Sequence, residues 1–262
     1  MIFSPPPSSS PVKAKLYKLL GLCCSLVVIS MLALIFCALT AGLLSVLGAV
    51  LSGGWQQFGQ ALRDLKAAAE TDGRTAQLAL FAIGLMFYLE FAAAILAVAR
   101  FGWGSAWREP IAWQPWSLWR NRKRVILIFA FTLLYSLAAN IALAYFYPPS
   151  VSWFKVPKDW LSLGMVFSLA VILAPLTEEL LFRGWIYTGL RSCIGIWPGL
   201  LLSSALFAFA HHEESHLYAL AVFPIDLVLG ALREWTGSIK PPMIFHSLYN
   251  FTAFWLSYFD IG

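Results

Sequence analysis

The feature that most constrains the fold is an apolar stretch that contains a charged turn. Residues 161–190 hold only three charged side chains, which are Glu178, Glu179 and Arg183. The stretch is long enough to cross a bilayer as a helix, which takes about 20 residues. Charged groups at that depth cost a few kcal/mol each on insertion scales and generally mark a functional site. We therefore predict a transmembrane helix with an intramembrane polar site.

The spacing of the three charges assigns them different partners. On a helix, Glu179 and Arg183 lie four residues apart on one face, with the acidic residue first, which is the favourable order for an ion pair. Glu178 is rotated by about 100° and misses this arginine. We predict that Arg183 holds Glu179 as a carboxylate, while Glu178 is left to act as a general base. The alternative for Glu179 and Arg183 is an ion pair that only locks helix packing.

The composition indicates that the rest of the chain is also embedded in a membrane. The chain is 60% hydrophobic and 12% charged, whereas a soluble domain carries about 25% charged residues. We predict an all-α fold, a polytopic transmembrane helix bundle of about seven spans, with the active-site cavity between the last four. The expected spans are residues 19–51, 76–99, 125–147, 161–190, 196–211, 217–232 and 239–259.

The basic residues predict one orientation in the membrane. With the N-terminus in the cytoplasm, twelve basic residues fall on the cytoplasmic side and five on the opposite side, as the positive-inside rule requires. We expect an integral multi-pass protein of the plasma membrane with a cytoplasmic N-terminus. The net charge is +5, and the basic residues that cause it lie in loops between apolar spans. They therefore predict contact with membrane lipids and not with nucleic acid.

The chain divides into three predicted regions. Residues 1–15 are rich in Pro and Ser and are expected to form a disordered cytoplasmic tail. Residues 16–159 contain the N-terminal spans, a loop or interfacial helix at 55–75, and a basic, Trp-rich segment at 100–124 that suits the headgroup level. Residues 160–262 form a transmembrane core that carries the polar motifs.

Two polar residues are expected at one depth in a helical hairpin. Glu178 lies 17 residues before Gly195 and His211 lies 16 residues after it. In an antiparallel pair both side chains then lie about 24 Å from the turn, at 1.5 Å per residue. His246 and Asn250 stand four apart on one face of the last span, with His246 about 10 Å in from the same side. These residues can therefore meet in one polar cavity.

The side-chain types point to hydrolysis of a peptide bond. A carboxylate and an imidazole that share a water can remove its proton and deliver it to a leaving amine. A second imidazole and an amide can hydrogen-bond the oxyanion of a tetrahedral intermediate. Each motif alone is unspecific, but their joint presence in this order on three apolar helices is much more specific.

These motifs resemble those of the CPBP family, the CAAX proteases and bacteriocin-processing enzymes also called Abi, which includes the type II CAAX prenyl endopeptidases. The motifs are Glu178-Glu179-x-x-x-Arg183, Phe207-x-x-x-His211 and His246-x-x-x-Asn250. The resemblance covers residues 160–259, and it implies a glutamate-type intramembrane endopeptidase without metal or cofactor. In such an enzyme Glu178 and His211 would activate water.

The resemblance also implies roles for the remaining motif residues. His246 and Asn250 would form the oxyanion site, and Glu179 and Arg183 would support the cavity. The implied partner is a membrane-embedded or lipidated protein or peptide, and its identity stays open. A prenylated CAAX protein, a bacteriocin leader and the sorting tail of a membrane protein are the alternatives. Asp226 is an additional charge that the motifs do not explain.

A zinc protease is the alternative enzyme. His212-Glu213-Glu214-Ser215-His216 is a literal His-Glu-x-x-His string, which on a helix presents two imidazoles to zinc with Glu213 as the base. Glu178 or His246 would then supply a third ligand. The string needs a continuous helix through 212–216, whereas the apolar run stops at Ala210.

Non-enzymatic functions form a further class of alternatives. A membrane scaffold or immunity protein would bind a partner peptide without cutting it. A transporter is the third possibility, although Gly- or Pro-broken helices in corresponding halves are not evident. Glu90 interrupts the second span; it could pair with Arg183, contribute to the cavity, or stay protonated against other helices.

Overall fold

The computed structural model describes residues 10–71, 73–146, 158–211 and 216–259, and within these ranges it contains helices and turns but no strand. Most of these residues lie in ten α-helices. Their bounds are α1 Pro11–Ser52, α2 Trp55–Thr71, α3 Gly73–Trp103, α4 Leu118–Phe146, α5 Trp160–Phe167, α6 Ala174–Glu179, α7 Tyr187–Ile194, α8 Ile196–Ala210, α9 His216–Thr236 and α10 Lys240–Tyr258. The predicted all-α fold is confirmed.

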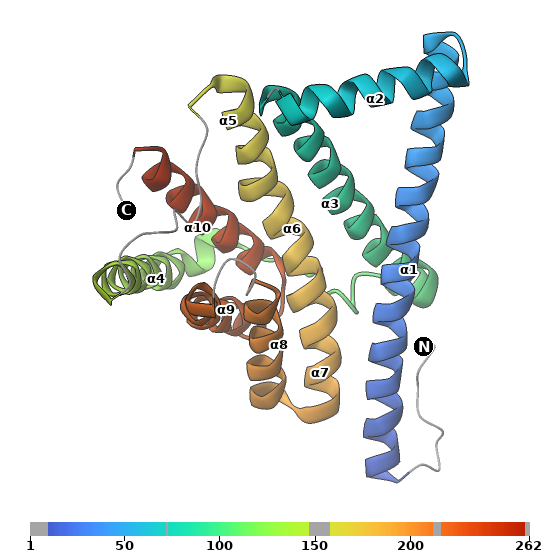
Figure 1. Cartoon of the computed structure of the whole chain (residues 1–262). Coiled ribbons are helices and arrows are strands. Elements are labelled where there is room, and N and C mark those ends of the chain that lie inside the picture. Colours follow the sequence, from blue (N-terminus) through green and yellow to red (C-terminus); the bar gives the residue numbers. More distant parts are fainter. Residues whose placement is uncertain (1–9, 72, 147–157, 212–215, 260–262) are drawn as a thin grey trace.

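A long central rod organises the molecule (Figure 1). It is built by α5, α6 and α7, which follow one another in one line. On one side α1 packs against α3 and α7, and α2 crosses between the ends of α1 and α3. On the other side α10 packs against α6, and α8 folds back along α7. The rod therefore carries the charged turn between two groups of helices.

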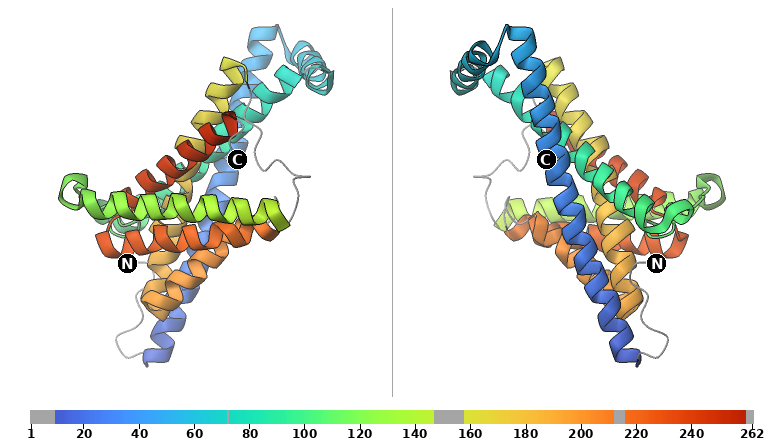
Figure 2. Two further views of the ribbon diagram at one scale, coloured as in Figure 1. Left: turned by 90° about the vertical axis from the view of Figure 1, so that its left-hand side faces the viewer. Right: turned by 90° about the vertical axis from the view of Figure 1, so that its right-hand side faces the viewer.

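The α4 and α9 helices run in a different direction from α1. Figure 2 shows the two lying side by side across the direction of α1, and they also contact each other. In the described part of the chain, three helical segments are long and apolar enough to cross a membrane: Pro11–Ser52, Gly73–Ala106 and Trp160–Ile194. These segments confirm an apolar helical bundle, and the number of seven spans stays a prediction.

Two wide helical turns flank α6 in the rod. They are the π-helical segments η2, Ser168–Leu173, and η3, Leu180–Ile186. Pro175 is the second residue of α6; a proline in a continuous helix lacks an N–H and clashes with the preceding turn, and a wider turn relieves this. Such π turns occur frequently at functional sites. Here they bracket Glu178 and Glu179, and the second of them contains Arg183.

The ends of the helices follow ordinary capping chemistry. The Ser10 side chain accepts a hydrogen bond from the Lys13 N–H at 3.4 Å, so α1 begins at Pro11 and not after residue 15 as predicted. The remaining part of that predicted tail, residues 1–9, lies outside the described residues. At α5 the Asp159 carboxylate accepts from the Ser162 N–H at 3.0 Å, and this bond lowers the pKa of Asp159 below its usual value.

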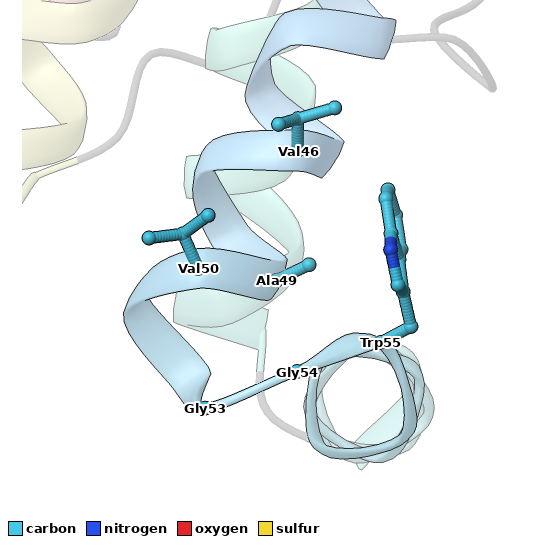
Figure 3. A pocket seen from close by; sticks show the side chains of 6 residues that line it. All are labelled: Val46, Ala49, Val50, Gly53, Gly54 and Trp55. Atoms are coloured by element: carbon cyan, nitrogen blue, oxygen red, sulfur yellow. The ribbon is translucent and has the colours of Figure 1, made fainter.

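The turn between α1 and α2 depends on two glycines. Gly53 and Gly54 have φ angles of +92° and +135°, a region that favours glycine because it has no Cβ. The turn brings Trp55 back toward Val46 and Ala49, and the hollow between them has a volume of about 220 Å³ (Figure 3). No charged or titratable side chain lines it. The α2 helix that follows covers most of residues 55–75, where a loop or an interfacial helix is predicted; its place at the membrane interface stays a prediction.

The Trp-rich connection between α3 and α4 is partly buried inside the protein. Ile111 is fully buried, and its carbonyl oxygen would lie 3.2 Å from a Cβ placed on Gly184. The Ala112 carbonyl accepts the Ile239 N–H at 3.1 Å, and the Gln114 carbonyl accepts the Ser238 hydroxyl at 2.8 Å. The composition of 100–124 predicted a segment at the headgroup level, but its middle packs on the rod and on the start of α10.

We expect Gly199→Ala to destabilise the protein. A Cβ at Gly199 would lie 3.0 Å from the backbone nitrogen of Arg191 and 3.2 Å from its Cα. Because these are backbone atoms, the α7–α8 hairpin must open, and overpacking of this kind costs about 1–3 kcal/mol. The control is Gly164→Ala on α5, where a Cβ meets nothing within 4 Å and alanine gains up to about 1 kcal/mol of helix propensity. Equal melting temperatures for the two variants would contradict the close approach.

Candidate active site

The charged turn lies at the junction of α6 and η3, and two of its three charges are fully enclosed. Glu179 is 0% and Arg183 1% exposed. Arg183 Nη1 donates to Glu179 Oε1 at 2.9 Å, so the predicted pairing four residues apart is confirmed. The Glu178 side chain is 19% exposed, which leaves it more accessible than its neighbour. The two adjacent carboxylates therefore have different surroundings.

Asp226 of α9 is the second partner of Arg183. Arg183 Nη2 donates to the Asp226 carboxylate and, at 3.2 Å, to the Asp226 backbone carbonyl. The Asp226 side chain is 1% exposed. The guanidinium carbon also lies 4.8 Å from the centre of the Phe207 ring, a cation–π arrangement. The charge that the motifs left unexplained thus belongs to the buried ion-pair network.

Glu90 does not take part in this network. Both of its carboxyl oxygens are buried and have no hydrogen-bond partner within the described residues, and the Arg183 contacts go to Glu179 and Asp226. Of the alternatives for Glu90, pairing with Arg183 is therefore wrong. Tyr88, two residues earlier on α3, does contact the helix of the first motif, because its carbonyl accepts the Thr177 hydroxyl at 3.2 Å.

The imidazole of His246 lies between the two glutamates. Its Nδ1 is 2.9 Å from Glu179 Oε1, and its Nε2 is 3.8 Å from Glu178 Oε2. His246 is 7% exposed. A separation of 3.8 Å is too long for a direct hydrogen bond. A water molecule beside the two atoms could hydrogen-bond to both His246 Nε2 and Glu178 Oε2. The structure thus brings the first and third motifs into contact.

His211 reaches this cluster through an aromatic ring. It caps the end of α8, and its Nδ1 is 2.9 Å from the Phe207 carbonyl oxygen. The His211 ring stacks on Phe207 with centroids 4.5 Å apart, and the same Phe207 meets His246 edge-on at 5.9 Å. One phenyl ring therefore contacts both imidazoles, which holds the second motif beside the other two.

Asn250 lies one turn after His246 on α10. Its side-chain nitrogen donates to the Ala170 carbonyl of η2 at 2.8 Å. A primary amide has two N–H groups, so this bond leaves one of them for a ligand. The contact ties α10 to the wide turn that precedes the charged motif. The predicted oxyanion role of Asn250 stays a prediction.

The zinc alternative falls largely on residues that the structure does not describe. His212, Glu213 and Ser215 lie outside the described residues, and so does the side chain of His216, where α9 begins. The α8 helix ends at Ala210. Among the residues that are described, no group of three or more His, Cys, Asp or Glu side chains could hold a metal ion.

Two of the contacts in this site had a signal in the sequence that was not interpreted. Asp226 is a lone acid inside an apolar stretch, and such a residue needs a buried partner of opposite charge. Phe207 belongs to the second motif, and a ring four residues before a histidine lies on the same helix face as that histidine. The bond from Asn250 to Ala170 had no signal, because its acceptor is a backbone carbonyl.

Comparison with known proteins identifies the same part of the chain. Residues 160–252 match the family model of type II CAAX prenyl endopeptidases, Rce1-like, a range that contains all six predicted site residues. The predicted resemblance to the CPBP family is thus confirmed for this segment.

Two curated relatives match over a similar length. An uncharacterised 24.3 kDa protein of Escherichia coli is 37% identical over 95 residues, which are 35% of this chain and 42% of that protein. The uncharacterised protein YpbD of Bacillus subtilis is 32% identical over 89 residues, 34% of this chain and 43% of YpbD. The chain therefore matches less than half the length of either relative. No solved structure matches.

Proposed function

We propose that this chain is an intramembrane endopeptidase. Its residues 160–252 match the family model of Rce1-like type II CAAX prenyl endopeptidases. It hydrolyses a peptide bond of a membrane-embedded or lipidated protein or peptide. The observation that carries the proposal is the placement of His246 between two inequivalent carboxylates, Glu179 at 2.9 Å and Glu178 at 3.8 Å. Inequivalent carboxylates beside an imidazole are what general acid–base chemistry requires.

The reaction assigns a step to each motif. Glu178, aided by His211, takes a proton from a water whose oxygen adds to the carbonyl carbon of the substrate. His246 and Asn250 donate hydrogen bonds to the resulting oxyanion. The C–N bond then breaks, and the amine leaves with the proton that Glu178 had taken. Glu179 and Arg183 keep the site charged and aligned, which their burial supports.

His246 can donate to an oxyanion only in one protonation state. An ionised Glu179 carboxylate can only accept, so His246 Nδ1, which lies 2.9 Å from Glu179 Oε1, would carry a proton. Nε2 donates only if it is protonated as well, which gives an imidazolium between two carboxylates. Neutral His246 would instead present the Nε2 lone pair toward Glu178 and could accept a proton from the shared water. In both protonation states His246 takes part in the reaction, either as a donor to the oxyanion or as an acceptor of the water proton.

The decisive experiment compares membrane proteomes of cells that produce the wild-type chain or Glu178→Gln. A protease predicts at least one membrane-associated protein that is shortened with the wild type and full-length with the variant. A scaffold predicts identical proteomes together with an unchanged phenotype. The sequence of the shortened terminus would identify the substrate among the CAAX, leader and sorting-tail alternatives.

Chelation separates the metal-free protease from the zinc alternative. Because Glu179 is already bonded to both Arg183 and His246, we expect 1,10-phenanthroline to leave the cleavage rate unchanged within about twofold. Loss of activity that added zinc restores, together with inactive His212→Ala and His216→Ala variants, would favour the metal enzyme instead.

A further inference from the structure

We propose that Asp226 is a positioning residue of this site, which acts through Arg183 and Glu179 to fix the His246 ring toward Glu178. The inference rests on the proposed function. It concerns a residue of α9 that lies outside the three motifs, 43 positions from Arg183 in the chain. Among the described residues, no hydrogen bond or ion pair joins Asp226 to Glu178, His211, His246 or Asn250, so we assign its effect to the residues between.

The first link is the fixation of Arg183 from two sides. Its Nη1 donates to Glu179 and its Nη2 donates to Asp226. The guanidinium is planar, so carboxylates on two of its nitrogens determine both its position and the orientation of its plane. A further bond to the Asp226 backbone carbonyl at 3.2 Å ties it to α9. Without the Asp226 carboxylate, Glu179 would be the only described residue that holds the charged end of Arg183 by an ion pair.

The second link is a shared oxygen atom. Glu179 Oε1 accepts from Arg183 Nη1 at 2.9 Å and lies 2.9 Å from His246 Nδ1. The other oxygen of Glu179 is buried without a hydrogen-bond partner in the described residues. Any rotation of the Glu179 carboxylate therefore disturbs both contacts at once. The position of Arg183 is transmitted in this way to the imidazole.

The third link is the direction in which His246 faces. A carboxylate that is held ionised by Arg183 can only accept, so His246 Nδ1 donates and Nε2 is turned toward Glu178. Orienting groups of this kind set the tautomer of catalytic histidines. The continuous order of contacts is Asp226, Arg183, Glu179, His246 and Glu178.

A double-mutant cycle tests whether Asp226 acts along this path. We expect Asp226→Asn to lower kcat about 10- to 100-fold, the size typical of residues that orient a catalytic ligand, and to leave KM within about twofold because Asp226 does not reach the substrate. Glu179→Gln should lower kcat similarly, and the double variant should be no slower than the slower single variant. Residues in one network are non-additive in this way.

Three comparisons make the outcome unambiguous. Ser203→Ala removes a buried hydrogen bond from α8 to the Phe182 carbonyl, so it should lower the melting temperature without changing kcat. The inference would be overturned if the fold losses in kcat of Asp226→Asn and Glu179→Gln multiplied in the double variant. A wild-type kcat for Asp226→Asn would also overturn it. A wild-type rate for Glu178→Gln in the same assay would instead overturn the proposed function itself. An inactive Glu178→Gln beside a fully active Asp226→Asn would leave that function standing and reject only the role of Asp226.

A measurement on the wild-type protein keeps the inference testable if Asp226→Asn does not fold. Nitrogen-15 NMR of labelled histidine, with His246→Gln used to assign the signal, should show a protonated Nδ1. A neutral ring that carries its proton on Nε2 would contradict the path from Asp226.

Discussion

Replacing Glu178 with glutamine is expected to lower the rate of peptide cleavage about 10³-fold, which lies within the range that general acid–base groups contribute. Glutamine has nearly the same shape but cannot take a proton from water. The Glu178 side chain is 19% exposed and its contact with His246 is 3.8 Å long, so the amide should fit without loss of folding. The measurement is cleavage of a membrane-anchored peptide by the purified protein in lipid vesicles.

The matched control is Glu234→Gln on α9. This carboxylate is 24% exposed and pairs with Arg191, so the variant loses the same charge at a similar exposure but outside the polar cluster. We expect its rate to stay within about threefold of the wild type, since exposed ion pairs contribute little. A Glu178→Gln protein that cleaves within tenfold of the wild type would show that Glu178 is not the base.

The helices could be predicted because each has a local signal. The charged helix was expected at 161–190 and extends over Trp160–Ile194, ending at Gly195, whose φ of +92° suits glycine. The predicted span 196–211 corresponds to α8, Ile196–Ala210. Apolar length and a single turn residue decide these limits, and both can be read from the sequence. The burial of Ile111 and Ala112 could not be predicted, because the Trp and Arg residues around them suit a lipid interface as well as a packed connection.

The height of the site residues along their helices could be predicted more readily than the direction in which their side chains point around the helix axis. Counting residues from Gly195 gives a height along each helix at 1.5 Å per residue. The first and third motifs do contact each other, and the second reaches them through Phe207. The count says nothing about which imidazole faces Glu178, and the contact that forms is with His246. The wide turns η2 and η3 add to this uncertainty, because every inserted residue rotates the following side chains by about 100°.

Replacing Arg183 with methionine is expected to cause a large loss of stability. Removing one partner of a buried ion pair costs about 3–5 kcal/mol, since the remaining charge is left buried and unpaired. Here Glu179 and Asp226 would both lose their cation, and each is at most 1% exposed. The thermal unfolding midpoint of the protein in detergent or lipid provides the measurement.

Arg191→Met supplies the comparison, because Arg191 also pairs with a carboxylate of α9. Its bonds to Glu234 are 2.7 and 2.8 Å long, but the Arg191 side chain is 46% exposed, so its loss should cost at most about 1 kcal/mol. Equal shifts for the two variants would contradict the contrast in burial. Replacing Glu179, Arg183 and Asp226 together by apolar residues should recover much of the stability, as in other buried ion networks. Such a protein should still not cleave, because the contact that orients His246 is gone; its stability without activity would indicate that these buried charges serve the reaction and not the fold.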